Sequence, residues 1–342
     1  MGGNVAIAEG AMLAGCQAYF GYPITPQNEL LEHLAKRMPE EGRIFLQTES
    51  ELAAISMVSG AAASGCRAMT STSSPGFSLQ QEGISYMSGA GIPSVIVNVM
   101  RTGPGLGNIG GMQGDYFQAT KGGGHGGHRM ISLAPNSVQE MMDFTMLAFE
   151  LADKYRNPVI LLSDAHLGLA MEPVTMRKPV KVFPPKPWAI TGAKGRKKNR
   201  INSFEMDPIN APARLKALME KYESLRCEVR HEEILLDDAS LVVVAYGSVS
   251  RSAISAVKMA REQGIKVGLL RPISLFPFPE APLIKLAKKV DNFLVAELSF
   301  GQLIEDVRAA VGHDKKVDLV NRLGGIALSA EDIFEAIKKM VK

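Results

Sequence analysis

Short β-branched segments typical of buried strands alternate with helical segments from the N-terminus to residue 163. This alternation favours a parallel sheet, because parallel strands need long crossover connections, and helical crossovers cover the sheet on both faces. The expected strands are residues 20–22, 43–47, 67–71, 94–100 and 158–163. The expected helices are residues 4–18, 28–38, 51–64, 78–89 and 138–155.

The same alternation returns in the C-terminal third of the chain. Strands are expected at 241–245, 266–270 and 292–296, and helices at 250–263, 281–290 and 303–311. The chain of 342 residues is long enough for two domains. We therefore expect an α/β protein with two α/β sandwich domains and mostly parallel sheets, at residues 1–172 and 237–342, joined by a segment at 173–236.

Residues 177–200 form a basic, proline-rich arm within that segment. They contain nine Lys or Arg and no acid, with prolines at 179, 184, 185 and 187. Prolines at this density exclude a helix interior or a central strand. The arm is therefore predicted to pack against solvent or a neighbouring subunit. A site for the phosphates of coenzyme A or for an acidic partner is the alternative.

Charge and cysteine usage exclude several classes of protein. The net charge of +3 is too small to indicate nucleic-acid binding. Cys16, Cys66 and Cys227 are far apart, so this chain alone is expected to form neither a zinc site nor an iron–sulfur cluster. No apolar run reaches the ~20 residues of a membrane span, and the N-terminus lacks the basic start of a signal peptide. A cytoplasmic protein is expected.

The segment Tyr22-Pro23-Ile24-Thr25-Pro26 joins an expected strand to an expected helix. Two prolines restrict the backbone around Thr25, so its hydroxyl is presented at a rigid junction beside a helix N-terminus, which suits a carboxylate. Thr25 is also a suitable N-cap, with Pro26 at the first helical position. From the residues alone, the N-cap interpretation is favoured.

Two acids and a hydroxyl-rich turn follow the next strands. Glu49 and Glu51 come after the strand at 43–47, at the edge of a parallel sheet where ligands bind. Either acid could instead compensate the dipole of the following helix. The turn at 70–78 contains Ser74 and Pro75 and offers donors to a ring or an anion, although it is also a plausible simple turn.

A glycine-rich loop follows Arg101. Eleven of residues 103–127 are Gly, and Gly105, Gly107 and Gly110 match G-x-G-x-x-G. A dinucleotide site also needs an acid about 20 residues later, and none occurs between Asp115 and Glu140. The favoured interpretation is that the glycines allow close approach to a ligand or a partner subunit. Arg101 suits a substrate carboxylate, with a surface ion pair as the alternative; His125 and His128 lack a third metal ligand nearby.

Taken together, several segments resemble the alpha subunit of 2-oxoacid:ferredoxin oxidoreductases, in family order and over essentially the whole chain. They are residues 22–26, Glu51 with Gly60-Ala61, the turn at 73–78, Arg101 and Gly114-Asp115-Tyr116. Residues 26–30, 81–86, 103–109, 116–126 and 152–158 are most similar to the 2-oxoisovalerate branch of that family. The implied fold is a thiamine-diphosphate-enzyme pyrimidine domain followed by a transketolase C-terminal-like domain.

The resemblance implies a role for individual residues. Glu51 matches the glutamate that hydrogen-bonds the pyrimidine N1′ of thiamine diphosphate, and Thr25 and Arg101 match residues that bind the substrate carboxylate. The remaining implied cofactor-binding residues are Tyr22, Pro23, Ile24, Ser74 and Pro75. Glu49, Asn108 and Asp115 are further candidates, and no metal ligand is expected in this chain.

The resemblance also implies partners. A beta-type subunit would carry the diphosphate and Mg²⁺ site, and gamma-type and ferredoxin-like delta-type subunits would complete the complex, with [4Fe-4S] clusters on partner chains. The implied reaction is oxidative decarboxylation of 2-oxoisovalerate to acyl-coenzyme A and CO₂, with reduction of ferredoxin. The alternatives are the same reaction on 2-oxoglutarate or pyruvate, a dinucleotide-binding dehydrogenase and a non-catalytic scaffold.

Overall fold

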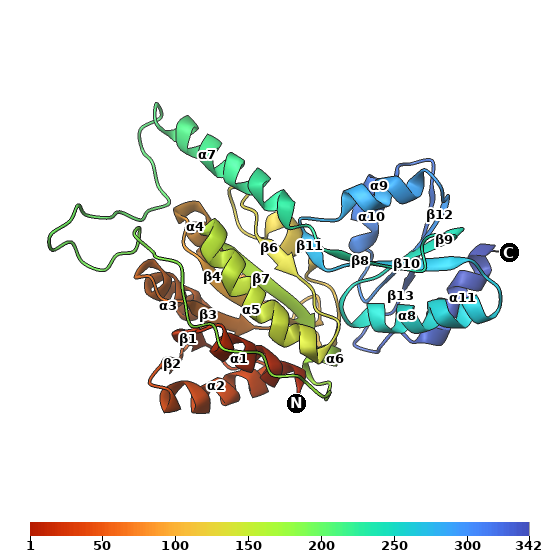
Figure 1. Ribbon diagram of the computed structural model, residues 1–342, viewed down its shortest axis with the longest axis horizontal. Coiled ribbons are helices and arrows are strands. Elements are labelled where there is room, and N and C mark those ends of the chain that lie inside the picture. The colour runs from red at the N-terminus through yellow and green to blue at the C-terminus, as the bar shows by residue number, and fades with distance from the viewer. Residues whose placement is uncertain (342) are drawn as a thin grey trace.

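The computed structural model describes residues 1–341 and contains two β-sheets (Figure 1). The first sheet has the order β11-β6-β7-β4-β3-β1-β2, with β5 paired to β4. Its neighbours are parallel except for β11 with β6 and β5 with β4. The strands are β1 (Ala18–Gly21), β2 (Ile44–Gln47), β3 (Ala68–Thr72), β4 (Ser94–Thr102), β5 (Asn108–Gly111), β6 (Ile131–Leu133), β7 (Pro158–Asp164) and β11 (Ser274–Phe276).

Helices cover both faces of the first sheet. On one face, α3 (Glu51–Ala63) and α4 (Ser74–Ala90) pack through Ile55 and Phe77 against Ile96 of β4. On the other face lie α1 (Gly3–Leu13), α2 (Asn28–Glu40) and α5 (Val138–Tyr155), which pack against Val95 and Val97. The short helix α6 (Ala165–Gly168) follows β7, and a π-helical turn spans Gln118–Gly122.

The second sheet has the order β13-β12-β9-β10-β8, and only β8 is antiparallel to its neighbour. Its strands are β8 (His231–Ile234), β9 (Leu241–Val244), β10 (Val267–Pro272), β12 (Asn292–Glu297) and β13 (Lys316–Asn321). α8 (Gly247–Glu262) and α11 (Ala330–Val341) pack on one face, and α9 (Glu280–Ala287) and α10 (Leu303–Val311) on the other. Two α/β sandwiches with mostly parallel sheets confirm the predicted fold class.

Several element boundaries differ from the predictions. The first helix ends at Leu13 rather than at residue 18, because Gly15 has a φ of +74° and the chain turns there into β1. The helix predicted to begin at residue 78 begins at Ser74, with Pro75 in its first turn, where the missing N–H is not needed.

Two strands pair across the predicted domain limits. β8 lies before residue 237 but pairs with β10 of the second sheet. β11 lies within 237–342 but pairs with β6 of the first sheet. Both strands are short, and neither was predicted. The helix α7 (Ala211–Ser224) and the 3₁₀ turn Leu225–Glu228 were also not predicted.

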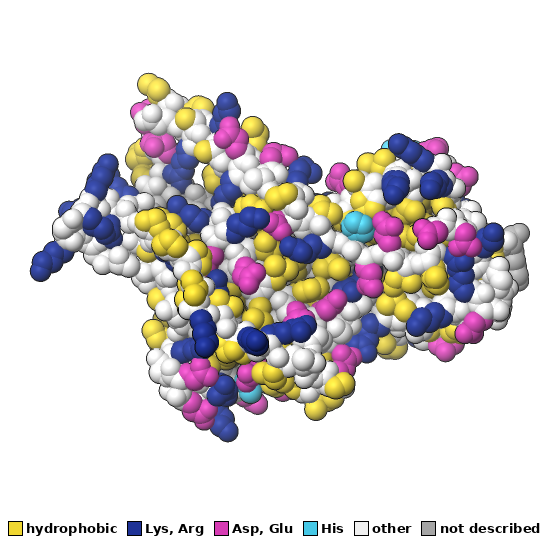
Figure 2. All heavy atoms as spheres, viewed as in Figure 1, with side chains coloured by type: hydrophobic (Ala, Val, Ile, Leu, Met, Phe, Trp, Pro, Cys, Tyr) yellow, Lys and Arg dark blue, Asp and Glu magenta, His cyan; other side chains and the backbone are white. Residues whose placement is uncertain are grey.

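The basic arm was predicted to pack against solvent or a neighbouring subunit. Part of it instead contacts the first domain of its own chain. The Arg67 guanidinium lies 4.8 Å from the Phe183 ring centroid, Lys186 Nζ lies 2.7 Å from Asp153, and Arg156 stacks on Trp188. The rest of the arm projects from the first domain (Figure 1), and basic side chains gather at its tip (Figure 2). None of the helices described in residues 1–341 is long and apolar enough to cross a membrane.

Candidate functional site

The carboxyl ends of four adjacent strands form one edge of the first sheet. The strands lie in the order β4-β3-β1-β2. Arg101 lies at the end of β4, Ser74 follows β3, Thr25 follows β1 and Glu51 follows β2. Because parallel strands deliver their carboxyl ends to the same edge, side chains far apart in the sequence meet there. This edge is the candidate site.

Glu51 is the first residue of α3, and its side chain is buried although it is ionisable. The residue is 5% exposed, and Ser50 caps the helix by accepting a hydrogen bond from the N–H of Ala53. Among residues 1–341 no hydrogen bond or ion pair involves the Glu51 carboxylate. A buried carboxylate without a partner in its own chain is available to a ligand that can share or donate a proton.

The start of α4 leaves room for this carboxylate. A methyl group added to Gly76 would lie 2.3 Å from Glu51 Oε1 and 2.1 Å from Thr72 Oγ1. Only glycine therefore lets the Glu51 side chain lie against the backbone of α4. Glu49, by contrast, is exposed.

Arg101 is 9% exposed and has no carboxylate partner in the part of the chain that the structure describes. Its Nη1 donates to the carbonyl oxygen of Thr25 at 3.0 Å and its Nη2 to that of Leu106 at 3.4 Å. Its Nε is buried without an acceptor in the described chain. The surface ion pair considered for Arg101 is therefore wrong, and an anion could compensate this charge.

Thr25 is not the N-cap that the residues alone favoured. α2 begins at Asn28 with Gln27 at the N-cap position, and the Thr25–Pro26 peptide bond is cis. The Thr25 hydroxyl accepts a hydrogen bond from Asn28 Nδ2 at 3.2 Å, while its carbonyl accepts from Arg101. The structure thus brings Thr25 and Arg101 together.

The neighbouring candidates differ in exposure. Tyr22 is 39% exposed, Pro23 is exposed and Ile24 is half-buried, so the loop after β1 offers an open apolar surface next to Thr25. Ser74 and Pro75 lie in the first turn of α4 at the same edge.

Asp115 connects the end of β4 to the start of α4. Its Oδ2 accepts hydrogen bonds from Ser74 Oγ at 2.6 Å and from Asn98 Nδ2 at 2.9 Å, and Ser74 Oγ accepts from the N–H of Arg101 at 3.0 Å. Removal from water raises the pKa of the Asp115 carboxyl, while both donors oppose that rise. Asp115 thus positions Arg101 through Ser74. Asn98, a polar residue inside an apolar strand, was the sequence signal for this network and was not recognised.

The glycine-rich loop is a β-hairpin rather than a strand-to-helix turn. β5 folds back antiparallel on β4, so the G-x-G-x-x-G match does not lead into the helix that a dinucleotide site requires. Asn108 lies at a contact between the domains, where its Nδ2 donates to the carbonyl oxygen of Gly324 at 3.2 Å. The glycines were predicted to allow close approach of a ligand or a partner subunit. In the structure Gly110 lies close to the second domain of the same chain, since a methyl on Gly110 would lie 2.7 Å from Gly325.

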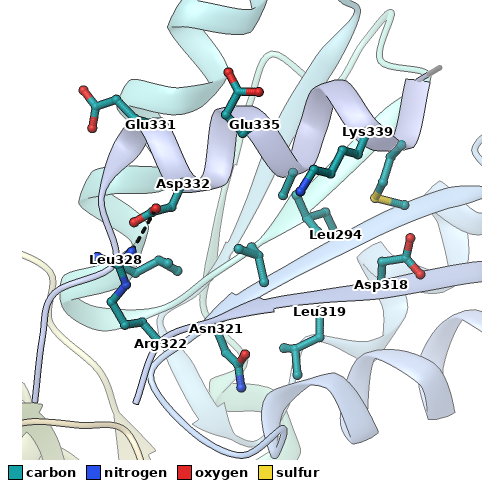
Figure 3. Close-up of a pocket in the computed structure, with 13 residues that line it drawn as sticks. Leu294, Asp318, Leu319, Asn321, Arg322, Leu328, Glu331, Asp332, Glu335 and Lys339 are labelled. Carbon is teal, nitrogen blue, oxygen red and sulfur yellow. Dashed lines mark hydrogen bonds and ion pairs between the residues drawn. The ribbon is translucent and has the colours of Figure 1, made fainter. Parts of the chain in front are cut away.

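The second domain carries a separate groove of about 580 Å³ between α11 and the edge strand β13 (Figure 3). Leu294, Leu319 and Leu328 lie among acidic and basic side chains of its lining. The candidate residues of the first sheet are not among the residues that line it. Within residues 1–341, no group of three His, Cys, Asp or Glu side chains has the arrangement of a metal site.

Comparison with protein families matches both domains. Residues 9–232 match the family described as "Pyruvate flavodoxin/ferredoxin oxidoreductase, thiamine diP-bdg", and residues 239–333 match "Pyruvate:ferredoxin oxidoreductase core domain II". The chain belongs to the 2-oxoacid:ferredoxin oxidoreductase family. The predicted family and enzyme class are thereby confirmed, and the thiamine-diphosphate-binding family model covers the whole candidate edge.

Curated members of the 2-oxoacid:ferredoxin oxidoreductase family are similar over nearly the full length. The ketoisovalerate oxidoreductase subunit VorB of Methanothermobacter thermautotrophicus is 53% identical over 340 residues, which cover 99% of this chain and 96% of that protein. The 2-oxoglutarate synthase subunit KorA of the same organism is 36% identical, with 99% and 97% covered.

Solved structures show the same architecture. The 2-oxoglutarate:ferredoxin oxidoreductase of Magnetococcus marinus superposes with a TM-score of 0.89 and 26% identity, covering 100% of this chain and 65% of that chain. A split-gene transketolase superposes with a TM-score of 0.61 and 16% identity, covering 98% and 95%, and so shows the fold alone.

Proposed function

We propose that this chain is the pyrimidine-binding, alpha-type subunit of an enzyme that oxidatively decarboxylates 2-oxoisovalerate to acyl-coenzyme A and CO₂ and reduces ferredoxin. The observation that carries the proposal is that a buried carboxylate, Glu51, and a buried cation, Arg101, lie at one edge of the sheet without an ion-pair partner in the described chain. Such a pair suits a ligand that has both a proton-sharing ring nitrogen and a carboxylate nearby.

Glu51 would hold the aminopyrimidine ring of thiamine diphosphate. Gly76 leaves room for the Glu51 carboxylate against the start of α4, and the burial of that carboxylate suits a short hydrogen bond to a ring nitrogen. When bound, thiamine diphosphate supplies the carbon nucleophile and the electron sink. The contribution of Glu51 is to hold a proton at the ring nitrogen, in a site from which water is largely excluded.

Arg101 and Thr25 would bind the substrate carboxylate. The Arg101 guanidinium is already oriented by two carbonyl oxygens, so little side-chain freedom remains to be lost when an anion binds. Asp115 and Ser74 fix the backbone from which Arg101 projects. These residues orient the 2-oxoacid beside the cofactor ring.

Partner chains would complete the site. Exposed apolar side chains occur on the edge strand β2 and on α3 and α4: Ile44, Leu46, Leu52, Met57 and Leu79. Apolar patches of this kind mark interaction sites, and we assign this one to the beta-type subunit that carries the diphosphate and Mg²⁺. The chain has three cysteines, all free, fewer than the four thiolates that hold a [4Fe-4S] cluster, so we assign the clusters to partner chains.

The choice of substrate follows the more similar relative. The subunit named for ketoisovalerate is 53% identical, against 36% for the subunit named for 2-oxoglutarate. The second candidate is accordingly the same chemistry on 2-oxoglutarate.

The test is coenzyme-A-dependent viologen reduction by the purified native complex with 2-oxoisovalerate, 2-oxoglutarate and pyruvate. We expect a preference for 2-oxoisovalerate and a loss of about 100-fold or more in kcat for Glu51→Gln, by the usual scale of acid–base catalysis. Glu49→Gln is the matched control, because that side chain is exposed, and it should retain activity. Activity retained in Glu51→Gln, or lost equally in both variants, would contradict the assigned role.

A further inference from the structure

Two aliphatic side chains of the β4–β5 hairpin project into solvent beside Arg101. Leu106 is 81% exposed and Ile109 is 63% exposed. Neither packs in a core of the described chain, so the fold of this chain does not explain why both are aliphatic. Exposed aliphatic residues that lie together mark a binding surface.

The backbone fixes Leu106 next to the guanidinium. Gly105 and Gly107, with φ of +71° and +60°, flank it, and a methyl on Gly107 would lie 1.7 Å from the carbonyl oxygen of Thr102. The tip of the hairpin therefore tolerates only glycine at these positions. In this tight turn the carbonyl oxygen of Leu106 accepts from Arg101 Nη2 at 3.4 Å while its side chain faces solvent.

A register shift in the hairpin places Ile109 opposite the step from Arg101 to Thr102. Arg101 pairs with Gly111 and Thr102 with Asn108, so Ile109 and Gly110 form a bulge in β5, and Ile109 is exposed there. Asn108 and Gly110 contact the second-domain loop at Gly324 and Gly325. That contact holds the hairpin in place, while Leu106 and Ile109 remain exposed.

We propose that Leu106 and Ile109 determine substrate specificity by contacting the branched aliphatic side chain of the 2-oxoacid whose carboxylate Arg101 binds. This inference rests on the proposed function. A ligand anchored at the buried Arg101 guanidinium would place the group next to its carbonyl carbon against this aliphatic pair. A dicarboxylic 2-oxoacid fits poorly, because residues 102–120 contain no Lys or Arg to compensate a second carboxylate.

The test compares kcat/KM for 2-oxoisovalerate, pyruvate and 2-oxoglutarate in the complete complex carrying Leu106→Ala, Ile109→Ala or both. For 2-oxoisovalerate, kcat/KM of the double variant should fall about 10–100-fold, mainly because KM rises, which is the scale expected for lost aliphatic contacts. For pyruvate, whose methyl group is smaller, the loss should stay within about threefold. Leu215→Ala on α7 is the matched control: it also removes an exposed leucine, 62% exposed, and should change neither value.

A second variant, Leu106→Lys, tests whether the lack of a cation near Arg101 disfavours a dicarboxylic 2-oxoacid. It should raise kcat/KM for 2-oxoglutarate relative to 2-oxoisovalerate by about tenfold or more, since a cation would then meet the second carboxylate. Thiamine diphosphate content and subunit composition are measured for every variant, so a failure of assembly is recognised directly.

The outcomes separate this inference from the proposed function. A wild-type complex that prefers another 2-oxoacid would overturn the proposed substrate. A wild-type preference for 2-oxoisovalerate, with equal losses for all three acids in the alanine variants and no gain in Leu106→Lys, would leave the proposed function intact. It would overturn the inference, and the two side chains would then be subunit contacts.

Discussion

At the scale of single residues, the candidate site is set apart by groups that the fold leaves uncompensated. Glu51 and Arg101 are each about nine-tenths buried or more, and neither is paired with an opposite charge among residues 1–341. Burying a charge without a partner costs several kcal/mol in effect, so such groups persist where function requires them. Other buried charged groups are ion-paired or hydrogen-bonded within the described chain. Arg67 pairs with Asp153 at 2.8 Å, and the Glu297 carboxylate accepts hydrogen bonds from the N–H groups of Gln302 and Leu303.

Part of this site could be predicted from the sequence, and part could not. Position after a strand singled out Glu51 and Arg101, because parallel strands deliver such residues to a common edge. It could not separate the hydroxyl of Thr25 from an N-cap, because that depends on where α2 begins. The amide of Asn98 had no recognised signature, because its partner Asp115 is close to it only in the folded chain.

Asp115→Asn should stabilise the protein at neutral pH. The raised pKa of this carboxyl means that folding favours its protonated form, so its contribution to stability is full below the ordinary pKa and is lost as pH rises through the raised one. Asparagine can accept the same two hydrogen bonds without that loss. We expect a rise in Tm of about 2 °C at pH 8 that vanishes towards pH 4.

Asp143→Asn is the control with the opposite sign. The hydrogen bond from Arg177 holds the pKa of Asp143 below its ordinary value, so its stabilisation is present at neutral pH and is lost as pH falls. Calorimetry of both variants from pH 4 to pH 8 checks the two directions. A lower Tm for Asp115→Asn at pH 8 would mean that its hydrogen bonds outweigh the cost of removing its charge from water.

At the scale of elements, the helices and strands that could be predicted from the sequence are those that depend least on pairing with distant parts of the chain. β4 and β9 are rich in β-branched residues and buried along their whole length, and both were predicted. β6 and β11 have three residues each and depend on pairing with distant segments, β6 with β7 and β11 with β6. α7 lies entirely within the described residues and none of its residues is buried, although Tyr222 packs half-buried against a core. Its apolar pattern is therefore weak, and the sequence did not reveal the helix.

Polar anchors should therefore hold α7 in place. Lys221 Nζ donates to the carbonyl oxygen of Ser88 at 3.0 Å, and Arg214 Nη2 donates to that of Gly89 at 3.1 Å, at the carboxyl end of α4. Removing both donors in Arg214→Ala/Lys221→Ala should raise amide exchange in residues 211–224 by about tenfold or more, and leave the two sheets unchanged. Hydrogen exchange with mass spectrometry measures this.

Lys216→Ala/Glu220→Ala on the exposed face of α7 is the matched control, since both variants introduce two alanines into one helix. Equal protection of α7 in the two double variants would show that the helix is held by contacts other than these donors.

At the scale of the whole molecule, the two domains are joined by the segment that follows the hairpin of the candidate site. The side chain of Gln113 is fully buried: its Nε2 donates to the carbonyl oxygen of Tyr246 and its Oε1 accepts from the N–H of Leu298, each at 3.0 Å. Gln302 of the second domain makes the converse pair, donating to the carbonyl oxygen of Gly114 and accepting from the N–H of Phe117. The position of the hairpin thus depends on both domains.

Gln113→Ala should uncouple the domains. The substitution leaves the buried N–H of Leu298 without a partner, at a cost of about 1–3 kcal/mol. It also removes one of the two hydrogen bonds to the carbonyl oxygen of Tyr246, which keeps the bond from the N–H of Ser250. We expect the calorimetric transition to broaden or split, and the KM for the 2-oxoacid to rise because Arg101 stands on the hairpin that this joint holds. Gln118→Ala, which removes one hydrogen bond to Ser78 at the surface, is the control and should leave both measurements unchanged. A single sharp transition at a lower Tm, with KM unaltered, would show that Gln113 contributes stability without positioning the site.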